Sequence, residues 1–182
     1  MLRTLACPLI LLLAVLPGPA QVRPGVERLA PYVPSPQAVV ERMLEAAALK
    51  PGETVYDLGC GDGRILITAA RRFRAKGVGV ELSAELASQT LEHVKRLGLQ
   101  NRITIIHGDL LEADVSPADV VTLYLETSSN ARLKPRLEQS LKSGARVVSH
   151  DFAMRGWKPA RVEKVEVSNR THTIYVYEIT KN

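Results

Sequence analysis

The sequence predicts a doubly wound α/β domain whose seven-strand sheet is mostly parallel and ends in an antiparallel hairpin. Short apolar runs alternate with amphipathic helical segments along most of the 182 residues, a pattern typical of a parallel sheet. The last two runs, 162–167 and 171–180, are separated only by the turn Ser168-Asn169-Arg170, which predicts a hairpin. The length suffices for one such domain and is too short for two.

Composition indicates an ordinary globular domain. Apolar residues make up 46% of the chain, and the net charge is +5 at pH 7. This small positive excess favours a solvated basic surface over an acidic partner or an anionic membrane. We predict no nucleic-acid partner and no metal site, and the oligomeric state is left open.

The first 20 residues have the layout of a signal peptide. Met1-Leu2-Arg3 is a short basic start, residues 5–16 are apolar, and Pro17-Gly18-Pro19-Ala20 offers small residues before a cut. The apolar stretch is shorter than the roughly 20 residues that span a bilayer. We therefore expect export, or membrane attachment through a short anchor, with 21–31 as a linker and 32–182 as the domain. A cytoplasmic location is expected only if the true start lies downstream.

The first two helices with clear end signals carry polar caps. Ser35 is expected to cap a helix that begins at Pro36 and is stopped by Pro51-Gly52. Ser83 is expected to cap another helix, which Gly98 ends.

The second half of the chain continues the alternation. A helix at 128–143 contains Pro135, which must lie in its first turn or kink it. The short apolar runs around this helix are of buried-strand type; they lie at 103–106, 120–125 and 145–149.

The most informative segment is 55–64, which reads Val-Tyr-Asp-Leu-Gly-Cys-Gly-Asp-Gly-Arg. An apolar strand containing Asp57 leads through a turn with three glycines into an amphipathic helix. Such glycines tolerate positive φ and let a ligand approach the backbone, while the helix start offers free N–H groups. A second strand, 78–81, ends in Glu81, which is placed to accept both hydroxyls of a ribose. The segment predicts a nucleoside-containing ligand.

The ligand could be a dinucleotide or S-adenosylmethionine (SAM). The dinucleotide fingerprint is G-x-G-x-x-G, but this chain reads G-x-G-x-G from Gly59 to Gly63. Asp57, just before the turn, would repel a pyrophosphate and suits the sulfonium and ammonium groups of SAM. SAM is therefore the predicted cofactor.

These residues resemble the SAM-binding motifs of class I, seven-strand methyltransferases, and the likeness covers roughly 32–180. It is carried by 57–64, Glu81 and Gly108-Asp109-Leu110. A narrower likeness, to protein-lysine methyltransferases related to those of the ATP synthase c-subunit and the adenine nucleotide translocase, is carried by Tyr32-Val33-Pro34-Ser35-Pro36 and 145–149. The resemblance implies a Rossmann-like methyltransferase fold, SAM as cofactor and a protein lysine as acceptor.

The resemblance also implies cofactor-binding roles. Asp57 and the backbone around Gly59 would hold the methionine end of SAM, and Glu81 would accept the ribose hydroxyls. Asp109 would accept from the adenine amino group, although Asp in a Gly-Asp turn can serve the turn alone. The full predicted set is Tyr32, Asp57, Gly59, Gly61, Glu81, Leu82, Asp109 and Leu110.

Methyl transfer depends mainly on in-line placement of a neutral nucleophile. A lysine must first lose its proton, and a carboxylate or histidine can position it and relay that proton. The candidates at strand ends are Glu126, His150 and Asp151. Tyr32 and Tyr124 could wall the site and favour the cationic methyl group. Tyr124 could equally be a core residue, and the His-Asp pair a structural one.

Two other functions stay open. The enzyme could methylate a small molecule at nitrogen or oxygen, although the short chain shows no lid insertion. A SAM-binding module without catalysis would keep the same binding residues, and only turnover separates it from an enzyme. No Asn-Pro-Pro-Tyr-like motif follows the run at 120–125, which argues against amide and nucleobase-amine methyltransferases.

Overall fold

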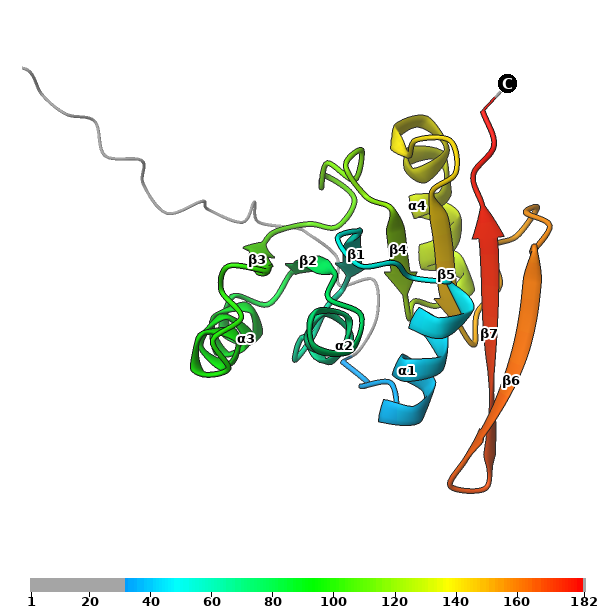
Figure 1. Ribbon diagram of the computed structural model, residues 1–182. Helices are drawn as coiled ribbons and strands as arrows, with labels where there is room; N and C mark the ends of the chain where they lie inside the picture. The colour runs from blue at the N-terminus through cyan, green and yellow to red at the C-terminus, as the bar shows by residue number, and fades with distance from the viewer. Residues whose placement is uncertain (1–31, 182) are drawn as a thin grey trace, which may run out of the picture.

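The computed structural model describes residues 32–181 and contains one sheet with helices on both faces (Figure 1). The helices are α1 (Gln37–Ala46), α2 (Arg64–Arg72), α3 (Ala84–Arg96) and α4 (Thr127–Ser140). The strands are β1 (Thr54–Leu58), β2 (Lys76–Glu81), β3 (Ile103–His107), β4 (Val120–Leu123), β5 (Arg146–His150), β6 (Arg161–Val167) and β7 (Arg170–Glu178). The predicted fold class is confirmed.

The strand order is β3-β2-β1-β4-β5-β7-β6, and only β7 pairs antiparallel with its neighbours β5 and β6. After β3 the chain crosses to the other side of β1, so β1 lies between β2 and β4. Leu58 is level with Val80 on one side and with Leu123 on the other. The carboxyl ends of β1 and β4 therefore meet where the winding direction reverses, which is where open α/β sheets bind their ligands.

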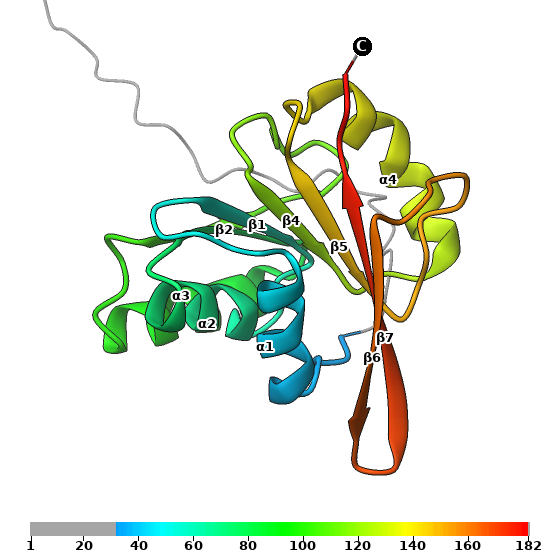
Figure 2. The same ribbon diagram turned by 45° about the vertical axis from the view of Figure 1, so that its right-hand side comes forward.

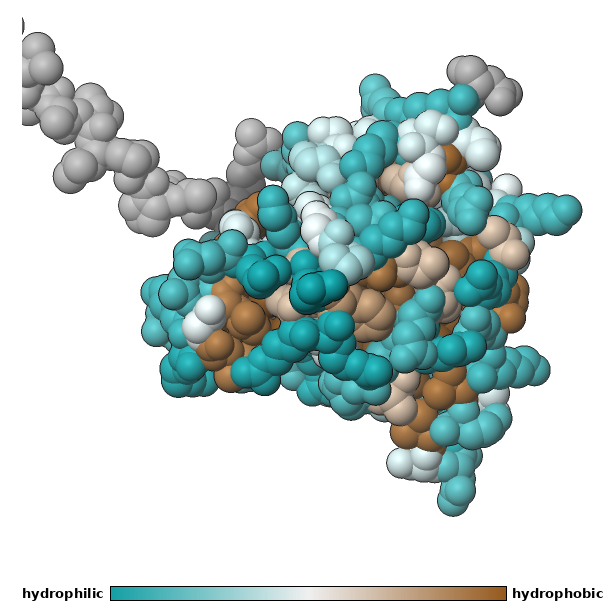
Figure 3. Space-filling model, viewed as in Figure 1, coloured by the Kyte–Doolittle hydropathy of each residue, from teal (hydrophilic) through white to brown (hydrophobic). Residues whose placement is uncertain are grey.

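Helices cover the two faces unequally. Figures 1 and 2 show α1, α2 and α3 on one face and α4 on the other. Met43 and Leu66 belong to the core of the first face. In α4 the residues Leu133 and Leu137 recur at helical spacing, and with Leu141 they join the core of the second face. Hydrophilic side chains cover much of the outer surface over α1, α2 and α3, with apolar ones visible between them (Figure 3).

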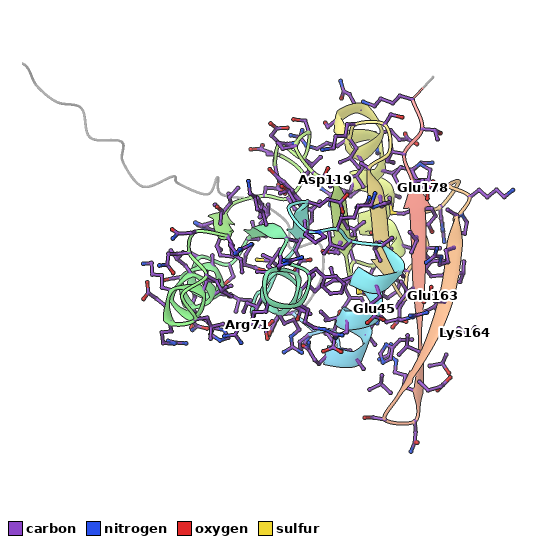
Figure 4. The ribbon with its side chains drawn as sticks, in the orientation of Figure 1. Glu45, Arg71, Asp119, Glu163, Lys164 and Glu178 are labelled. Carbon is purple, nitrogen blue, oxygen red and sulfur yellow. The ribbon has the colours of Figure 1, made fainter. Side chains whose placement is uncertain are left out.

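Helix α1 joins the hairpin to the rest of the sheet. Arg42 Nε lies 2.5 Å from Glu163 Oε2 on β6, and Figure 4 shows Glu163 beside this helix. Arg72 on α2 forms an ion pair with Glu41 on α1. The same figure shows Asp119 and Glu178 at the opposite end of the sheet, near the starts of β4 and β5. These two ion pairs fix α1 between α2 and the hairpin.

The predicted hairpin is present and overhangs the sheet. Ser168 and Asn169 both have positive φ, 50° and 63°, as a two-residue type I′ turn requires. His150 at the end of β5 is level with Ile174 on β7, so residues 170–173 continue beyond β5. Figure 2 shows the hairpin projecting past the rest of the sheet. Its overhang brings β7 side chains to the carboxyl end of β5.

Helix ends follow the predictions only in part. Ser83 Oγ accepts a hydrogen bond from Leu86 N at 3.3 Å, so the cap of α3 is confirmed. Ser35 does not cap α1: Pro36 occupies the cap position, and the Ser35 hydroxyl bonds to His150 Nδ1 instead. Helix α1 also ends at Ala46, before the predicted stop at Pro51-Gly52.

Pro135 was predicted to lie in the first turn of its helix or to kink the helix. Pro135 is the ninth residue of the helix and lies in its interior, not in its first turn. The buried leucines on either side of it supply the packing that holds the helix there, since most helical stability in proteins comes from tertiary packing.

The prediction of export or membrane attachment is wrong for this domain. In the described part of the chain, no helix is long and apolar enough to cross a membrane. The prediction rested on residues 1–20 alone, whose apolar stretch is shorter than a spanning helix needs. That segment and the predicted linker, 21–31, lie outside the described residues.

Candidate active site

A crevice of about 980 Å³, counting its open mouth, lies at the carboxyl ends of β1, β2 and β4. All of the residues predicted to bind the cofactor line it; they are Tyr32, Asp57, Gly59, Gly61, Glu81, Leu82, Asp109 and Leu110. The structure therefore brings the predicted set together at the point where the sheet reverses its winding. Their individual roles stay predictions.

The glycines of the turn have different reasons to be glycine. All three have positive φ, between 53° and 87°. A Cβ on Gly61 would lie 2.5 Å from Tyr32 Cε2, and a Cβ on Gly63 would lie 2.7 Å from Thr90 Cγ2. These two glycines let the Tyr32 ring and helix α3 approach the turn. Gly59 has only Leu125 Cδ2 near its Cβ position, at 3.8 Å, so it leaves backbone open to the crevice.

Asp57 is a buried carboxyl group at the floor of the crevice. Its Oδ1 accepts a hydrogen bond from Thr122 Oγ1 at 2.8 Å. Burial raises the pKa of Asp57 to about 7. A neutral hydroxyl compensates a buried negative charge only in part, and a cation beside the carboxylate would favour the ionised form. The site is chemically suited to the ammonium or sulfonium group of SAM.

Glu81 is held by two backbone N–H groups. Gly61 N donates to Oε2 at 3.0 Å and Ser83 N donates to Oε1 at 2.9 Å. Each carboxylate oxygen can accept more than one hydrogen bond. The two oxygens are therefore fixed in position and still able to accept from a ribose diol.

Asp109 first serves its own turn. Its Oδ1 accepts a hydrogen bond from Leu111 N at 2.8 Å, the turn-forming role that competes with the predicted adenine contact. A carboxylate has enough lone pairs for both. Leu110 is buried beside it and lines the same crevice.

The loop 32–36 is fastened to the glycine turn by Arg64. The guanidinium donates from Nη1 to the Ser35 carbonyl oxygen at 2.8 Å and pairs with Asp62 Oδ2 through Nη2 at 2.6 Å. Tyr32 and Val33 stay 49% and 54% exposed at the rim. Burial, followed by the negative charge of Asp62, raises the pKa of the Tyr32 phenol.

The three residues predicted to handle the acceptor do not line the crevice. Glu126 is exposed, precedes α4 and borders a neighbouring depression with Phe152 and Arg155. His150 is completely buried, and Asp151 follows it. Tyr124 does line the crevice, and its ring stacks on the His150 ring with 3.9 Å between centroids. The catalytic roles stay predictions, and His150 would have to act through a neighbour.

Sequence reasoning missed two residues that form hydrogen bonds with His150, namely Ser35 and His172. Ser35, predicted only as a cap, lines the crevice and places Oγ 2.8 Å from His150 Nδ1. His172 on β7 places Nδ1 2.8 Å from His150 Nε2 and 3.2 Å from Asp151 Oδ2. The available signal is the greater length of the predicted run 171–180 compared with 145–149, since it lets β7 extend beyond the end of β5 and bring His172 there.

A metal ion is a chemical possibility at the same place. His150, Asp151 and His172 offer three donor atoms within 4.8 Å of one another. Their separations also suit hydrogen bonds, and Arg170 Nη2 donates to Asp151 Oδ2 at 3.0 Å. The expectation of no metal site stays a prediction.

Comparison with known proteins gives consistent matches. The family model for the ANTKMT methyltransferase domain matches residues 57–161. A protein-lysine N-methyltransferase of Saccharolobus islandicus is 51% identical over 82% of this chain and 93% of its own length. The adenine nucleotide translocase lysine N-methyltransferase of Mus musculus is 30% identical over 87% of this chain and 69% of its own.

A solved structure agrees in fold and sequence. The crystal structure of an RNA methyltransferase from Salinibacter ruber, in complex with S-adenosyl-L-homocysteine, has a TM-score of 0.77 and 44% identity. The match covers 82% of this chain and 95% of that one.

The reversed sheet, the crevice at its switch point and these likenesses define a SAM-dependent methyltransferase. SAM is its cofactor, and the fold predicted from the sequence is the methyltransferase fold. The chain belongs to the ANTKMT methyltransferase domain family. Neither the comparisons nor the described residues support the predicted signal peptide.

Proposed function

We propose that this enzyme transfers the methyl group of SAM to a lysine side chain of a protein. The observation that carries the proposal is the 51% identity, across 93% of its length, to a protein-lysine N-methyltransferase. The 30% identical mouse relative is also a lysine N-methyltransferase. Both alignments cover more than four-fifths of this chain, so they extend well beyond a cofactor motif.

The crevice fits a lysine delivered on a large substrate. It is open to solvent and has exposed Tyr32 and Val33 at its rim. An apolar rim can cover the methylene stem of a lysine, and the ring of Tyr124 can face its charged end. A protein substrate supplies its own contacts outside the crevice, so a deep closed pocket is not needed.

When bound, SAM supplies a methyl group on a sulfonium that leaves readily. The chain has to bind this cofactor, orient it and admit a neutral amine in line with the methyl carbon. Asp57 is placed to hold the cationic end, and Glu81 is placed to accept the ribose hydroxyls. The aromatic ring of Tyr124 lies on the same crevice wall as Leu125, just beyond β4.

RNA is the second candidate acceptor, because the Salinibacter ruber protein is described as an RNA methyltransferase. The residues after β4 are Tyr124-Leu125-Glu126 rather than an Asn-Pro-Pro-Tyr-like motif. Glu126 also adds a negative charge near the acceptor side, which disfavours a phosphate backbone. These features favour lysine.

Incubation of the purified full-length chain with methyl-labelled SAM and a cell extract tests the proposal. Half of each reaction is treated with protease and half with ribonuclease, and the labelled material is acid-hydrolysed. We expect label in protein bands that protease removes, and methyl-lysines in the hydrolysate.

Other outcomes assign the other functions. Label removed only by ribonuclease would overturn the lysine proposal in favour of RNA. Label confined to small molecules would indicate a small-molecule enzyme. Absence of any label, while calorimetry shows SAM binding, would indicate a binding module without catalysis. The Asp57→Asn variant serves as the cofactor-site control.

A further inference from the structure

A continuous row of hydrogen-bonding side chains leads from the crevice to the hairpin. Ser35 lines the crevice and its Oγ is 2.8 Å from His150 Nδ1. The opposite nitrogen of that ring, Nε2, is 2.8 Å from His172 Nδ1. His172 Nδ1 in turn lies 3.2 Å from Asp151 Oδ2. Three separate parts of the fold, the loop before α1, the end of β5 and the hairpin strand β7, supply these residues.

We propose that Ser35, His150 and His172 form a proton relay for the acceptor lysine. The relay takes a proton from the lysine ammonium group and delivers it to His172, which then forms an ion pair with Asp151. The inference rests on the proposed function, since only an ammonium acceptor needs such a path. In this relay Ser35 is the residue that contacts the substrate. His150 and His172 act through it and are positioning residues.

The proton movements balance without any further reactant. The ammonium gives a proton to Ser35 Oγ while the Ser35 hydroxyl proton moves to His150 Nδ1. The proton on His150 Nε2 then moves to His172 Nδ1, which leaves an imidazolium beside the Asp151 carboxylate. The neutral amine attacks the methyl carbon, the C–S electron pair stays on sulfur, and the methylated amine carries the positive charge. His172 then passes its Nδ1 proton by way of Asp151 Oδ2 to solvent. Proton exchange with water, while the crevice holds no substrate, returns His150 to the tautomer that carries its proton on Nε2 and accepts again from Ser35 at Nδ1.

The surroundings of His150 suit a neutral intermediate carrier. The side chain is completely buried, and burial disfavours the charged form of an imidazole. A positive charge is therefore unstable on this ring and passes on. The Tyr124 ring, stacked at 3.9 Å between centroids, holds the imidazole plane in place between Ser35 and His172.

The surroundings of His172 suit the final carrier. Asp151 is held by Thr173 N, which donates to Oδ1 at 2.8 Å, and by the Arg170 guanidinium, 3.0 Å from Oδ2. The Arg170 side chain is 62% exposed, so water screens its charge. The charged or titratable groups around the relay are Asp151, Arg170 and the Tyr124 phenol, and Arg64 donates to the Ser35 carbonyl oxygen.

A buried hydrogen-bonded pair of histidines could also serve stability alone, and pH separates the two roles. A relay matters most when nearly all acceptor lysine is protonated. It becomes dispensable near the unperturbed lysine pKa of about 10.4, because bulk water then supplies neutral amine. A structural defect has no reason to disappear at high pH.

The test compares Ser35→Ala, Ser35→Thr and His172→Gln with the unchanged full-length enzyme after treatment with a chelator. The acceptor is the extract protein labelled in the assay above, and the readouts are methyl-lysine formation from pH 7 to 10 and SAM affinity by calorimetry. His93→Gln on α3 is the matched control, since it removes a histidine outside the relay.

We expect Ser35→Ala and His172→Gln to slow methyl-lysine formation by about a hundredfold at pH 7, the usual scale of acid–base catalysis. The deficit should narrow to within about threefold near pH 10, with SAM affinity unchanged. Ser35→Thr should restore most of the rate, and His93→Gln should leave it unchanged.

A deficit of constant size across the pH range, or no deficit at all, would overturn the relay while lysine methylation by the unchanged enzyme still stands. Loss of activity on chelation, restored by zinc, would overturn it in favour of a metal held by His150, Asp151 and His172. If the unchanged enzyme forms no methyl-lysine, the proposed function fails first and the relay with it.

Discussion

Gly61 donates its backbone N–H to Glu81 Oε2 at 3.0 Å, so the glycine turn after β1 and the acid at the end of β2 form one unit. Thr90 on α3 closes the unit from outside by donating to the Gly61 carbonyl at 2.7 Å. The two strongest sequence signals for a nucleoside cofactor are thus held together by hydrogen bonds of the protein itself.

Glu81→Ala should weaken SAM binding by about 1–3 kcal/mol, because it removes a charged acceptor and leaves the Gly61 N–H without its partner. Titration calorimetry with SAM and S-adenosylhomocysteine measures the loss. Glu85→Ala, in the exposed first turn of α3, is the control and should bind normally. An unchanged affinity in Glu81→Ala would remove this residue from the cofactor site.

Gly61→Ala should lower both stability and SAM affinity. Its φ of 53° disfavours any side chain, by about 1–2 kcal/mol, and its Cβ would meet Tyr32 Cε2 at 2.5 Å. Gly98 also has positive φ, 69°, but has nothing within 4 Å of the Cβ position. Gly98→Ala should therefore lose stability by a similar amount and keep its affinity. Thermal unfolding measures the loss of stability, and calorimetry measures the loss of SAM affinity. Equal losses of affinity in the two variants would contradict a role for the Tyr32 contact.

Asp57 should make SAM affinity depend on pH. Burial raises the pKa of Asp57 to about 7, and a bound cation favours the ionised carboxylate. Affinity should therefore rise as pH increases through about 7. Calorimetry over roughly three pH units around that pKa, from about pH 5.5 to about 8.5, should show the rise in SAM affinity. The Asp57→Asn variant should show no such rise. A flat profile in the unchanged protein would contradict the cation contact.

The stability of the cofactor-free protein should change in the opposite direction. An acid whose folded pKa lies above its unfolded value of about 3.9 binds more protons in the folded state, so stability falls as pH rises from about 4 to 7. The fall attributable to Asp57 is at most about 4 kcal/mol. Denaturant unfolding of the unchanged protein and Asp57→Asn at pH 4.5 and 7.5, roughly at the two ends of this window, measures it. A difference between the two proteins that is the same at both pH values would refute the burial of an ionisable carboxyl group.

Glu126 is predicted to act on the acceptor, from a position bordering the depression next to the crevice. Glu126→Gln should lower turnover far more than SAM affinity, since the residue does not line the cofactor crevice. Steady-state rates and calorimetry on the same preparation compare the two effects. Glu138→Gln, on the exposed side of α4, is a matched control. Turnover equal to that of the control would show that Glu126 takes no part in the reaction.

The sequence predicts the cofactor side of this site better than the acceptor side, for a physical reason. Cofactor residues such as Asp57 and Glu81 lie at strand ends and in a local turn, and parallel pairing brings them together automatically. The cluster around His150 depends on a loop and a hairpin far away in sequence. Nothing local to Ser35 distinguishes a helix cap from a partner of a distant histidine.

Helix boundaries show the same limit. Gly98 ends α3 as predicted, because a local change in φ is enough to stop a helix. Pro135 was expected either in the first turn of its helix or at a kink; it lies inside α4, where Leu133 and Leu137 pack in the core. Tertiary packing overrides a local preference there, and a single sequence does not reveal it.

Tandem mass spectrometry of the protein labelled in the extract tests the central claim, SAM-dependent methylation of a protein lysine, most directly. The labelled band is digested after reaction with the unchanged enzyme and, in parallel, with Glu81→Ala. We expect peptides whose lysine side chains carry the added mass of whole methyl groups, and we expect far fewer of them in the reaction with Glu81→Ala. Methyl groups found only on other side chains, or only on RNA, would contradict it.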